Sequence, residues 1–278
     1  MEKHLPPTSR SSGHGAEQPI LVIDAVSKNF RTAGGGTFAA VKAVSLTVHA
    51  GEIVALVGES GSGKSTLGRI ALGLMAPDSG NVTFDGTRLT GLPAEAFRTL
   101  RTGMQPIFQD PTASLNPRKT VRELLVQALW KQPGQGAARC IQLLEDVGLR
   151  PAANFIDRYP HELSGGQRQR VSIARSLAME PRLIIADEPL SGADVSIRGQ
   201  VLNLMLDIQK SHDVAYLMIT HDISIARAFA SRVAVMMKGE LVEVGPAEQV
   251  LSNPRHAYTK RLVDAVPMLG AVTPAARA

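Results

Sequence analysis

The stretch Gly58-Glu59-Ser60-Gly61-Ser62-Gly63-Lys64-Ser65-Thr66 fits the phosphate-binding pattern G-x-x-x-x-G-K-[ST]. Residues 52–57 before it are rich in apolar and β-branched types, as expected for a buried parallel strand. Apolar residues at helical spacing follow the loop, at Leu67, Ile70, Ala71 and Leu74. Glycines let backbone N–H groups point inward, and a helix N-terminus adds positive charge. This setting predicts a nucleotide site in which Lys64 reaches the β and γ phosphates and the Ser65 hydroxyl ligates Mg²⁺.

The composition is that of a globular protein with a substantial core. The 278 residues are 44% apolar and 20% charged, which suits one large α/β domain or a core with a smaller insert. No apolar run approaches the roughly 18 residues needed to cross a bilayer. We expect residues 1–18 to be disordered, residues 267–278 to be loose, and the protein to stay in the cytoplasm, since the N-terminus lacks the apolar block of a signal peptide.

Two further features of the composition restrict the function. Cys140 is the only cysteine, which excludes an internal disulfide and a cysteine-based metal centre. The net charge of +5 is not accompanied by a strip of alternating aromatic and basic residues, so we expect no nucleic-acid partner.

The pattern along the chain predicts an α/β core interrupted by a helical insert. Two strands of an antiparallel edge sheet are expected at 20–26 and 41–48, and a hairpin at 233–244. Other strands are expected at 81–84, 183–186 and 214–219, and a helix at 164–178. The insert is predicted from two helical sets, Val121, Leu124, Leu125 and Ala128 in the first and Ile141, Leu143, Leu144 and Val147 in the second.

Two carboxylates follow the apolar run 183–186. Parallel strands deliver ligand groups at their C-terminal ends, beside the phosphate loop if the two strands are neighbours. Asp187 is then placed to hold Mg²⁺ through water, and Glu188 to orient or deprotonate an attacking water. An ordinary acidic strand end is the alternative interpretation.

A second candidate anion site begins at Leu163-Ser164-Gly165-Gly166-Gln167. Ser164 and Gln167 form the capping box S-x-x-Q of a helix that carries Arg168, Arg170 and Arg175. A well-capped helix would explain this by itself. The two glycines nevertheless leave the backbone amides accessible to an anion. A second anion-binding helix start has little use in a monomer that already has a phosphate loop.

Five motifs together resemble the ATP-binding cassette ATPases. They occur in that family's order over roughly residues 20–265: Gly58–Thr66, Gln109 in Phe108-Gln109-Asp110-Pro111, Leu163–Gln167, Asp187-Glu188 and Thr220-His221-Asp222. The resemblance implies an α/β, RecA-like phosphate-loop NTPase core with an antiparallel edge sheet. It implies a cassette over 19–266, with the helical subdomain inserted at about 100–180.

The same resemblance implies a head-to-tail dimer that sandwiches two ATP molecules. Ser164 to Gln167 would contact the γ-phosphate held by the opposite subunit. Gln109 would complete the Mg²⁺ shell, His221 would contact the γ-phosphate and hold the arrangement around Glu188, and Phe30 would stack on adenine.

Asp194 would communicate across this dimer. Many relatives have Ser-Ala-Leu-Asp there, whereas this chain has Ser191-Gly192-Ala193-Asp194. Glycine loosens the backbone, so the strength of the coupling between the two sites is left open.

Four short sequence motifs resemble those of the oligopeptide, dipeptide and nickel importer branch of this family. They lie at residues 108–118, 159–162, 194–197 and 253–259, the last with Ala257 in place of the usual proline. The resemblance implies an ATPase subunit on the cytoplasmic face of the inner membrane, bound peripherally to two permease subunits and supplied by a solute-binding protein. The second ATPase could be the same chain or a paralogue. Peptide is favoured over nickel or a metal chelate as the solute.

Two other functions remain open from the sequence. A similar cassette serves as an accessory ATPase of a carbon–phosphorus lyase complex. Cassettes also act in DNA repair and translation, although those carry long coiled-coil insertions or a second cassette, and neither occurs in this chain.

Overall fold

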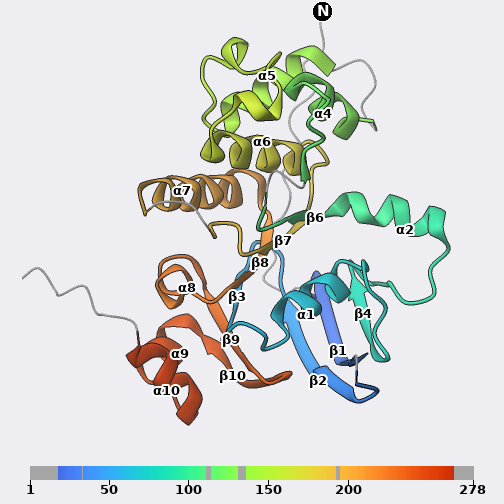
Figure 1. The fold of residues 1–278 in the computed structure, drawn as a ribbon, viewed down its shortest axis with the longest axis vertical. Coiled ribbons are helices and arrows are strands. Elements are labelled where there is room, and N and C mark those ends of the chain that lie inside the picture. Colours follow the sequence, from blue (N-terminus) through green and yellow to red (C-terminus); the bar gives the residue numbers. More distant parts are fainter. Residues whose placement is uncertain (1–17, 33, 111–113, 131–135, 192–194, 266–278) are drawn as a thin grey trace, which may run out of the picture.

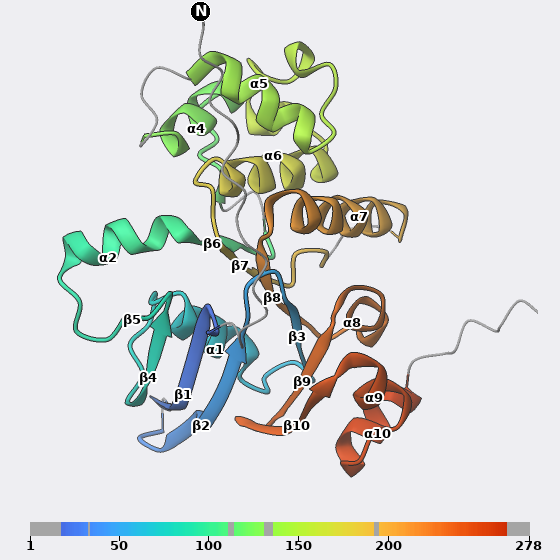
Figure 2. The same cartoon turned by 180° about the vertical axis from the view of Figure 1, so that it is seen from behind.

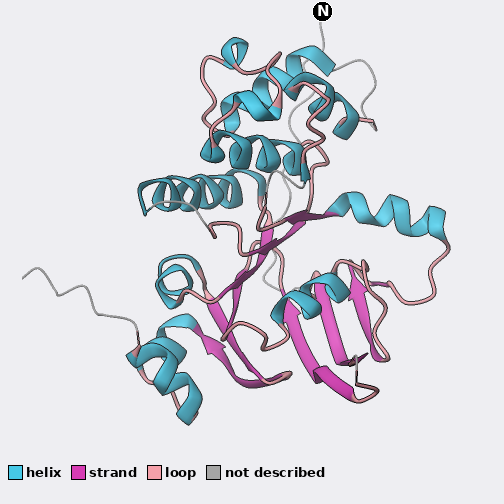
Figure 3. Ribbon diagram, in the orientation of Figure 1, coloured by secondary structure: helices cyan, strands magenta, loops and turns pink. Residues whose placement is uncertain are grey.

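The structure is a computed structural model, and it describes residues 18–32, 34–110, 114–130, 136–191 and 195–265. Two β-sheets and their helices form the lower part of the molecule, and a helical lobe stands above them (Figures 1 and 3). The lobe connects to the sheets through the segments around β6 (Met104–Ile107) and β7 (Leu183–Asp187). A mixed α/β architecture with a helical insert is therefore confirmed.

The larger sheet has six strands in the order β10-β9-β3-β8-β7-β6. Its remaining strands are β3 (Ile53–Val57), β8 (Ala215–Thr220), β9 (Arg232–Met237) and β10 (Glu240–Pro246). All neighbours pair in parallel except β9 and β10, which form the predicted hairpin. Every residue of β3 and β8 is buried, which explains why these strands are continuous apolar runs.

The smaller sheet is antiparallel, with the order β2-β1-β4-β5. Its strands are β1 (Leu21–Arg31), β2 (Thr37–Val48), β4 (Ser79–Phe84) and β5 (Thr87–Arg88). The expected edge sheet is confirmed, but β1 and β2 run beyond the expected 20–26 and 41–48. Because of this extension Phe30 pairs directly with Phe38.

Helix α1 (Lys64–Ala71) follows the phosphate loop and packs on β2, β7 and β8. The prediction that Lys64 lies in its first turn is confirmed, but the extension of the helix to Leu74 was wrong. Gly73 adopts the left-handed conformation, with φ of 64°, and the N–H of Leu74 closes onto the carbonyl of Arg69 at 2.9 Å. This glycine ends the helix, and Leu74 is left 48% exposed.

The helical lobe consists of α4 (Val121–Ala128), α5 (Gly136–Asp146) and α6 (Gly165–Leu177). Capping boxes at Thr120 and Ser164 start α4 and α6. The predicted apolar sets form the core of the lobe, except that Ile141 is 44% exposed. The three arginines of α6 have a structural role, since each donates a hydrogen bond to a backbone carbonyl. Arg168 donates to Leu163, Arg170 to Val147 and Arg175 to Ser114.

The remaining helices cover the flanks of the sheets (Figure 2). They are α2 (Ala94–Leu100), α7 (Val195–His212), α8 (Ile223–Phe229), α9 (Ala247–Ser252) and α10 (Ala257–Asp264), with 3-10 turns at Arg101–Gly103, Ala152–Asn154 and Pro160–Glu162. The last three helices lie beside the β9–β10 hairpin. Within the described ranges, no helix combines the length and apolar character needed to cross a bilayer.

Candidate functional site

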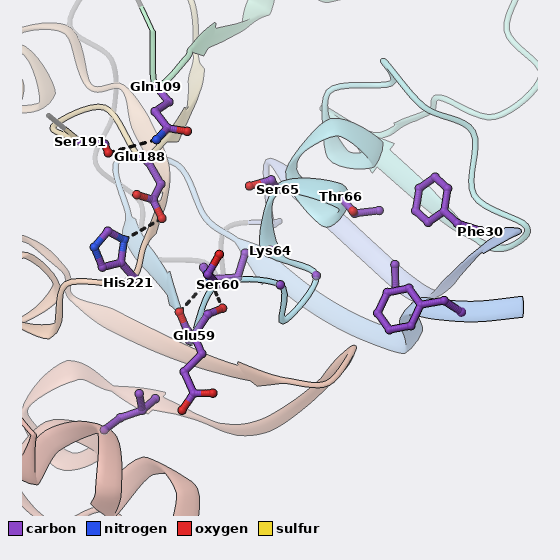
Figure 4. Close-up of a pocket in the computed structure, with 16 residues that line it drawn as sticks. Phe30, Glu59, Ser60, Lys64, Ser65, Thr66, Gln109, Glu188, Ser191 and His221 are labelled. Atoms are coloured by element: carbon purple, nitrogen blue, oxygen red, sulfur yellow. Dashed lines mark hydrogen bonds and ion pairs between the residues drawn. The ribbon is translucent and has the colours of Figure 1, made fainter. Parts of the chain in front are cut away.

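A cavity of about 780 Å³ opens where the loop between β3 and α1 meets the ends of β1, β7 and β8 (Figure 4). It is lined by Phe30, Phe38, Ala40, Gly58, Glu59, Ser60, Gly61, Gly63, Lys64, Ser65, Thr66, Gln109, Glu188, Ser191, His221 and Leu262. Motifs more than 100 residues apart in the sequence therefore surround one space.

The phosphate loop is held by close backbone packing. A Cβ atom on Gly58 would overlap the carbonyl oxygen of Met236, and one on Gly63 would overlap the carbonyl oxygen of Ala40. Both glycines also have positive φ, 155° and 107°, a region that other residues adopt only at a cost. These two glycines are thus required by the neighbours of the loop as well as by its curl.

Lys64 is 5% exposed and lies inside the loop. Its ammonium donates to the carbonyls of Gly58 at 2.7 Å and Glu59 at 2.8 Å. Burial lowers the pKa of Lys64, and the nearby carboxylates of Glu188, Asp187 and Glu59 oppose that shift. The loop therefore holds a cation in position where a polyphosphate would approach.

Asp187 meets the phosphate loop from across the sheet. Its strand is not a direct neighbour of β3, because β8 lies between β3 and β7. The three strand ends are nevertheless level, and α1 packs across β8, so the Ser65 hydroxyl donates to Asp187 Oδ1 at 3.0 Å. Burial raises the pKa of Asp187, and the bond from Ser65 partly offsets this rise.

These two side chains fit a magnesium ion. A hydroxyl and a carboxylate oxygen beside a phosphate-binding loop are the ligand types that Mg²⁺ takes together with phosphate oxygens and water.

Glu188 and His221 form a pair on the wall of the cavity. Nδ1 of His221 lies 2.8 Å from Oε1 of Glu188 (Figure 4). Glu188 has φ of 48°, in the left-handed region, and its N–H is held by the carbonyl of Ile219 at 2.9 Å. Such a conformation costs roughly 1–2 kcal/mol in a residue with a Cβ, and strain of this kind concentrates at functional sites.

Gln109 follows β6 and reaches toward the same wall. Its side-chain amide donates to the hydroxyl of Ser191 at 3.0 Å, so the linker to the helical lobe contacts the segment that follows Glu188. No pattern in the sequence pointed to Ser191 as a site residue. Only the pairing of β6 with β7 places these two residues together.

Two aromatic rings lie at the far end of the cavity. Phe30 is 38% exposed and Phe38 is 52% exposed, and their strands pair them directly. Contiguous exposed apolar surface, such as two paired aromatic rings, marks binding sites. Phe38 was missed, because its pairing with Phe30 depends on the register of β1 and β2 and on the bulges within them.

The helix that begins at Ser164 lies away from this cavity. Its capping box is confirmed, with the Gln167 N–H donating to Ser164 Oγ at 3.3 Å and the Ser164 N–H to Gln167 Oε1 at 2.9 Å. No described residue that lines the cavity comes from Ser164 to Gln167, and α6 belongs to the other lobe (Figure 1). A Cβ on Gly165 would have no atom within 4 Å. Asp194 lies outside the described residues.

Comparison with known proteins agrees with these motifs. A family profile described as "ABC transporter" matches residues 41–191, more than half of the chain. The chain belongs to the ABC transporter family. A second profile, "Oligopeptide/dipeptide transporter, C-terminal region", matches residues 242–277 of the cassette.

Curated relatives of the cassette include the Glutathione import ATP-binding protein GsiA of Escherichia coli (strain K12). It is 49% identical over 233 residues, which cover 82% of this chain and 37% of that protein. The GsiA protein of Salmonella paratyphi A is 50% identical with the same coverage. The cassette thus spans little more than a third of the length of these relatives.

Solved structures share the fold. The cbiO1 protein of Clostridium perfringens, part of the ABC transporter complex cbiONQ, has a TM-score of 0.75 at 29% identity, covering 85% of this chain and 92% of that one. The ATP-binding cassette MJ0796, in a dimeric post-hydrolysis state bound to ADP and Pi, has a TM-score of 0.73 at 29% identity, covering 82% and 98%. The predicted phosphate-loop NTPase core is confirmed.

Proposed function

We propose that the cassette hydrolyses ATP to power an importer for small peptides. Support comes from the profile of the oligopeptide and dipeptide branch at 242–277 and from relatives named for glutathione import, glutathione being a small peptide. Nickel or a metal chelate is the second solute class of this branch. The carbon–phosphorus lyase and nucleic-acid alternatives are not favoured by these relatives.

ATP occupies the cavity with its triphosphate on the loop and its base at the aromatic end. Phe30 stacks on adenine, and Phe38 extends the same surface. Lys64 and the amides of the loop bind the β and γ phosphates. Ser65, Asp187 and Gln109 would hold Mg²⁺. When bound, Mg²⁺ neutralises charge that develops on the phosphate oxygens.

Glu188 is the general base of the reaction. Its carboxylate takes a proton from a water whose oxygen bonds to the γ-phosphorus, and the bond to the β-γ bridging oxygen breaks, giving ADP and phosphate. His221, 2.8 Å from Glu188, fixes the direction of that carboxylate and contacts the γ-phosphate. Lys64 stabilises the charge on the departing oxygens.

The single observation that carries the proposal is the separation of two anion sites on one chain. The phosphate loop lines the cavity, whereas the start of α6 at Gly165 belongs to the other lobe, where a Cβ atom would have open space around it. A second cassette, the same chain or a paralogue, placed head to tail lets Ser164 to Gln167 of each chain close on the ATP of the other. Asp194 acts at that interface. Closure therefore depends on ATP, and hydrolysis reverses it.

We assign the contact with the membrane subunits to a hollow of about 640 Å³ between α2 and the helical lobe. Phe97, Phe108 and Trp130 contribute to its lining, and the Arg98 guanidinium lies 5.1 Å from the centre of the Trp130 ring. Phe108, which lines this hollow, directly precedes Gln109, so movement there is linked to the nucleotide. Two permease subunits would dock on the two copies of this surface at the cytoplasmic face of the inner membrane, with a solute-binding protein on the other side.

The substitution Glu188→Gln tests the catalytic assignment. We expect ATP binding to be retained and hydrolysis to fall by at least about 100-fold, within the range of general-base contributions. The variant should accumulate as an ATP-bound dimer in size-exclusion chromatography. Glu240→Gln, which alters a surface carboxylate paired with Lys42 outside the cavity, is the matched control. Turnover at the level of that control would remove Glu188 from its role.

A further inference from the structure

A tyrosine from the C-terminal region reaches the phosphate loop. The backbone N–H of Glu59 donates to the hydroxyl of Tyr258 at 3.0 Å. Tyr258 stands in the second position of α10 and is 3% exposed. Burial raises the pKa of its hydroxyl above the ordinary value, so this bond joins two neutral groups at physiological pH.

The bonded N–H belongs to a peptide unit that is held at both ends. The same Gly58–Glu59 peptide presents the Gly58 carbonyl, which accepts from the Lys64 ammonium at 2.7 Å. Hydrogen bonds in such a chain polarise one another, since a bonded N–H makes the carbonyl of its own amide a better acceptor. The Tyr258 hydroxyl and the Lys64 ammonium are therefore linked through one rigid, planar group.

The position of Tyr258 is itself fixed by the sheet. The carboxylate of Glu243, on β10, accepts the backbone N–H groups of Arg255 at 2.8 Å and His256 at 3.0 Å, where α10 begins. His256 then caps the helix by accepting the N–H of Tyr258 at 3.2 Å. One turn further along α10, Leu262 lines the nucleotide cavity. The hydroxyl thus stands on a rigid support rather than on a loose tail.

We propose that Tyr258 is a positioning residue for nucleotide binding. Its hydroxyl fixes the Gly58–Glu59 peptide, and that peptide sets where the Lys64 ammonium stands before ATP arrives. The C-terminal region at 242–277 therefore supports the phosphate loop directly. This inference rests on the proposed ATP site and adds a support that the nucleotide-binding motifs do not include.

Tyr258→Phe tests the inference, because it removes only the hydroxyl oxygen. We expect the Kd for Mg²⁺–ATP and for ADP, measured by calorimetry, to rise by about 2- to 10-fold, the effect of one neutral hydrogen bond. The turnover number at saturating ATP should change by less than about 2-fold, because ground-state and transition-state binding are lost together. The Glu59 amide resonance should shift.

Two controls separate this role from a general loss of packing. Tyr216→Phe also removes a buried tyrosine hydroxyl, one for which the described part of the chain offers no hydrogen-bond partner. Val250→Ala loosens the cluster in which Tyr258 packs without touching the loop. Both should leave the Kd for ATP unchanged.

An ATP Kd in Tyr258→Phe equal to that of the wild type, or an equal rise in Val250→Ala, would overturn the inference. If Tyr258→Phe does not fold, amide hydrogen exchange in the wild-type protein decides. A protected Glu59 amide supports the bond, and an amide that exchanges freely overturns it. Wild-type protein that binds no ATP would instead refute the nucleotide site itself, and the two failures are thereby distinguished.

Discussion

The substitution Gly165→Asp should stabilise the chain itself and impair the head-to-tail dimer. Gly165 is the first residue of α6, has no positive φ, and has open space where a Cβ atom would lie. An acidic residue in the first turn of a helix is favourable by about 0.3–1 kcal/mol, and replacement of glycine adds a few tenths. At about 2–4 °C per kcal/mol for a domain of this size, the melting temperature should rise by about 1–5 °C.

The same carboxylate should oppose catalysis. If the partner's γ-phosphate comes within roughly 5 Å, two unit charges at an effective dielectric constant of about 20 repel by about 3 kcal/mol. Since about 1.4 kcal/mol corresponds to tenfold, ATP turnover should fall by roughly 100-fold. Binding of ATP to the variant's own loop should not change, because no described residue that lines the cavity comes from this helix.

The measurements are phosphate release at saturating Mg²⁺–ATP, thermal unfolding without nucleotide, and ATP binding by calorimetry. Gly136→Asp is the matched control, because Gly136 is the first residue of α5 in the same lobe and a Cβ atom there would come no closer than 3.9 Å to Val126 Cγ2. Wild-type turnover in Gly165→Asp would refute the head-to-tail dimer. A fall in the melting temperature of Gly165→Asp would refute the expected stabilisation of α6. An equal loss of turnover in Gly136→Asp would show that the loss is not specific to the start of α6.

Two further results are expected. Because burial raises the pKa of Asp187, ionisation of its carboxyl destabilises the folded chain, and this cost appears as pH rises from the ordinary carboxyl pKa to the raised one. Asp187→Asn should therefore melt no lower than the wild type at pH 7, lose that advantage below about pH 4, and lose Mg²⁺-dependent turnover. A lower melting temperature of the variant at pH 7 would contradict the raised pKa. Trp130→Glu, at the hollow assigned to the permease, should reduce transport in the assembled complex while ATP turnover of the isolated cassette is retained. Ile141→Glu, which alters an equally exposed apolar residue in the same lobe, should change neither transport nor turnover. Unchanged transport in Trp130→Glu would remove the hollow from the interface.

The local elements of the site were predictable from the sequence because their causes are local. The loop from Gly58 to Thr66 curls through its own glycines, and Ser164 and Gln167 cap their helix through bonds three residues apart. Buried parallel strands carry continuous apolar runs, which indicated β3, β7 and β8 without knowledge of their order.

Contacts made by distant segments were not predictable in this way. The end of α1 before Gly73 was missed, because an apolar Leu74 at helical spacing does not reveal a left-handed residue before it. The left-handed conformation of Glu188 and the pairing of Gln109 with Ser191 likewise depend on how neighbouring strands are aligned.

The sequence by itself therefore determined that this chain has a phosphate loop, a capped helix that begins after Ser164 and two carboxylates at a strand end, since each is encoded within a few consecutive residues. Only the tertiary structure decided that Asp187 meets Ser65 across β8, that Phe38 lies beside Phe30, and that the Tyr258 hydroxyl accepts from the Glu59 N–H. The physical reason is that such contacts depend on strand order, register and the docking of α10, which result from the packing of the whole core.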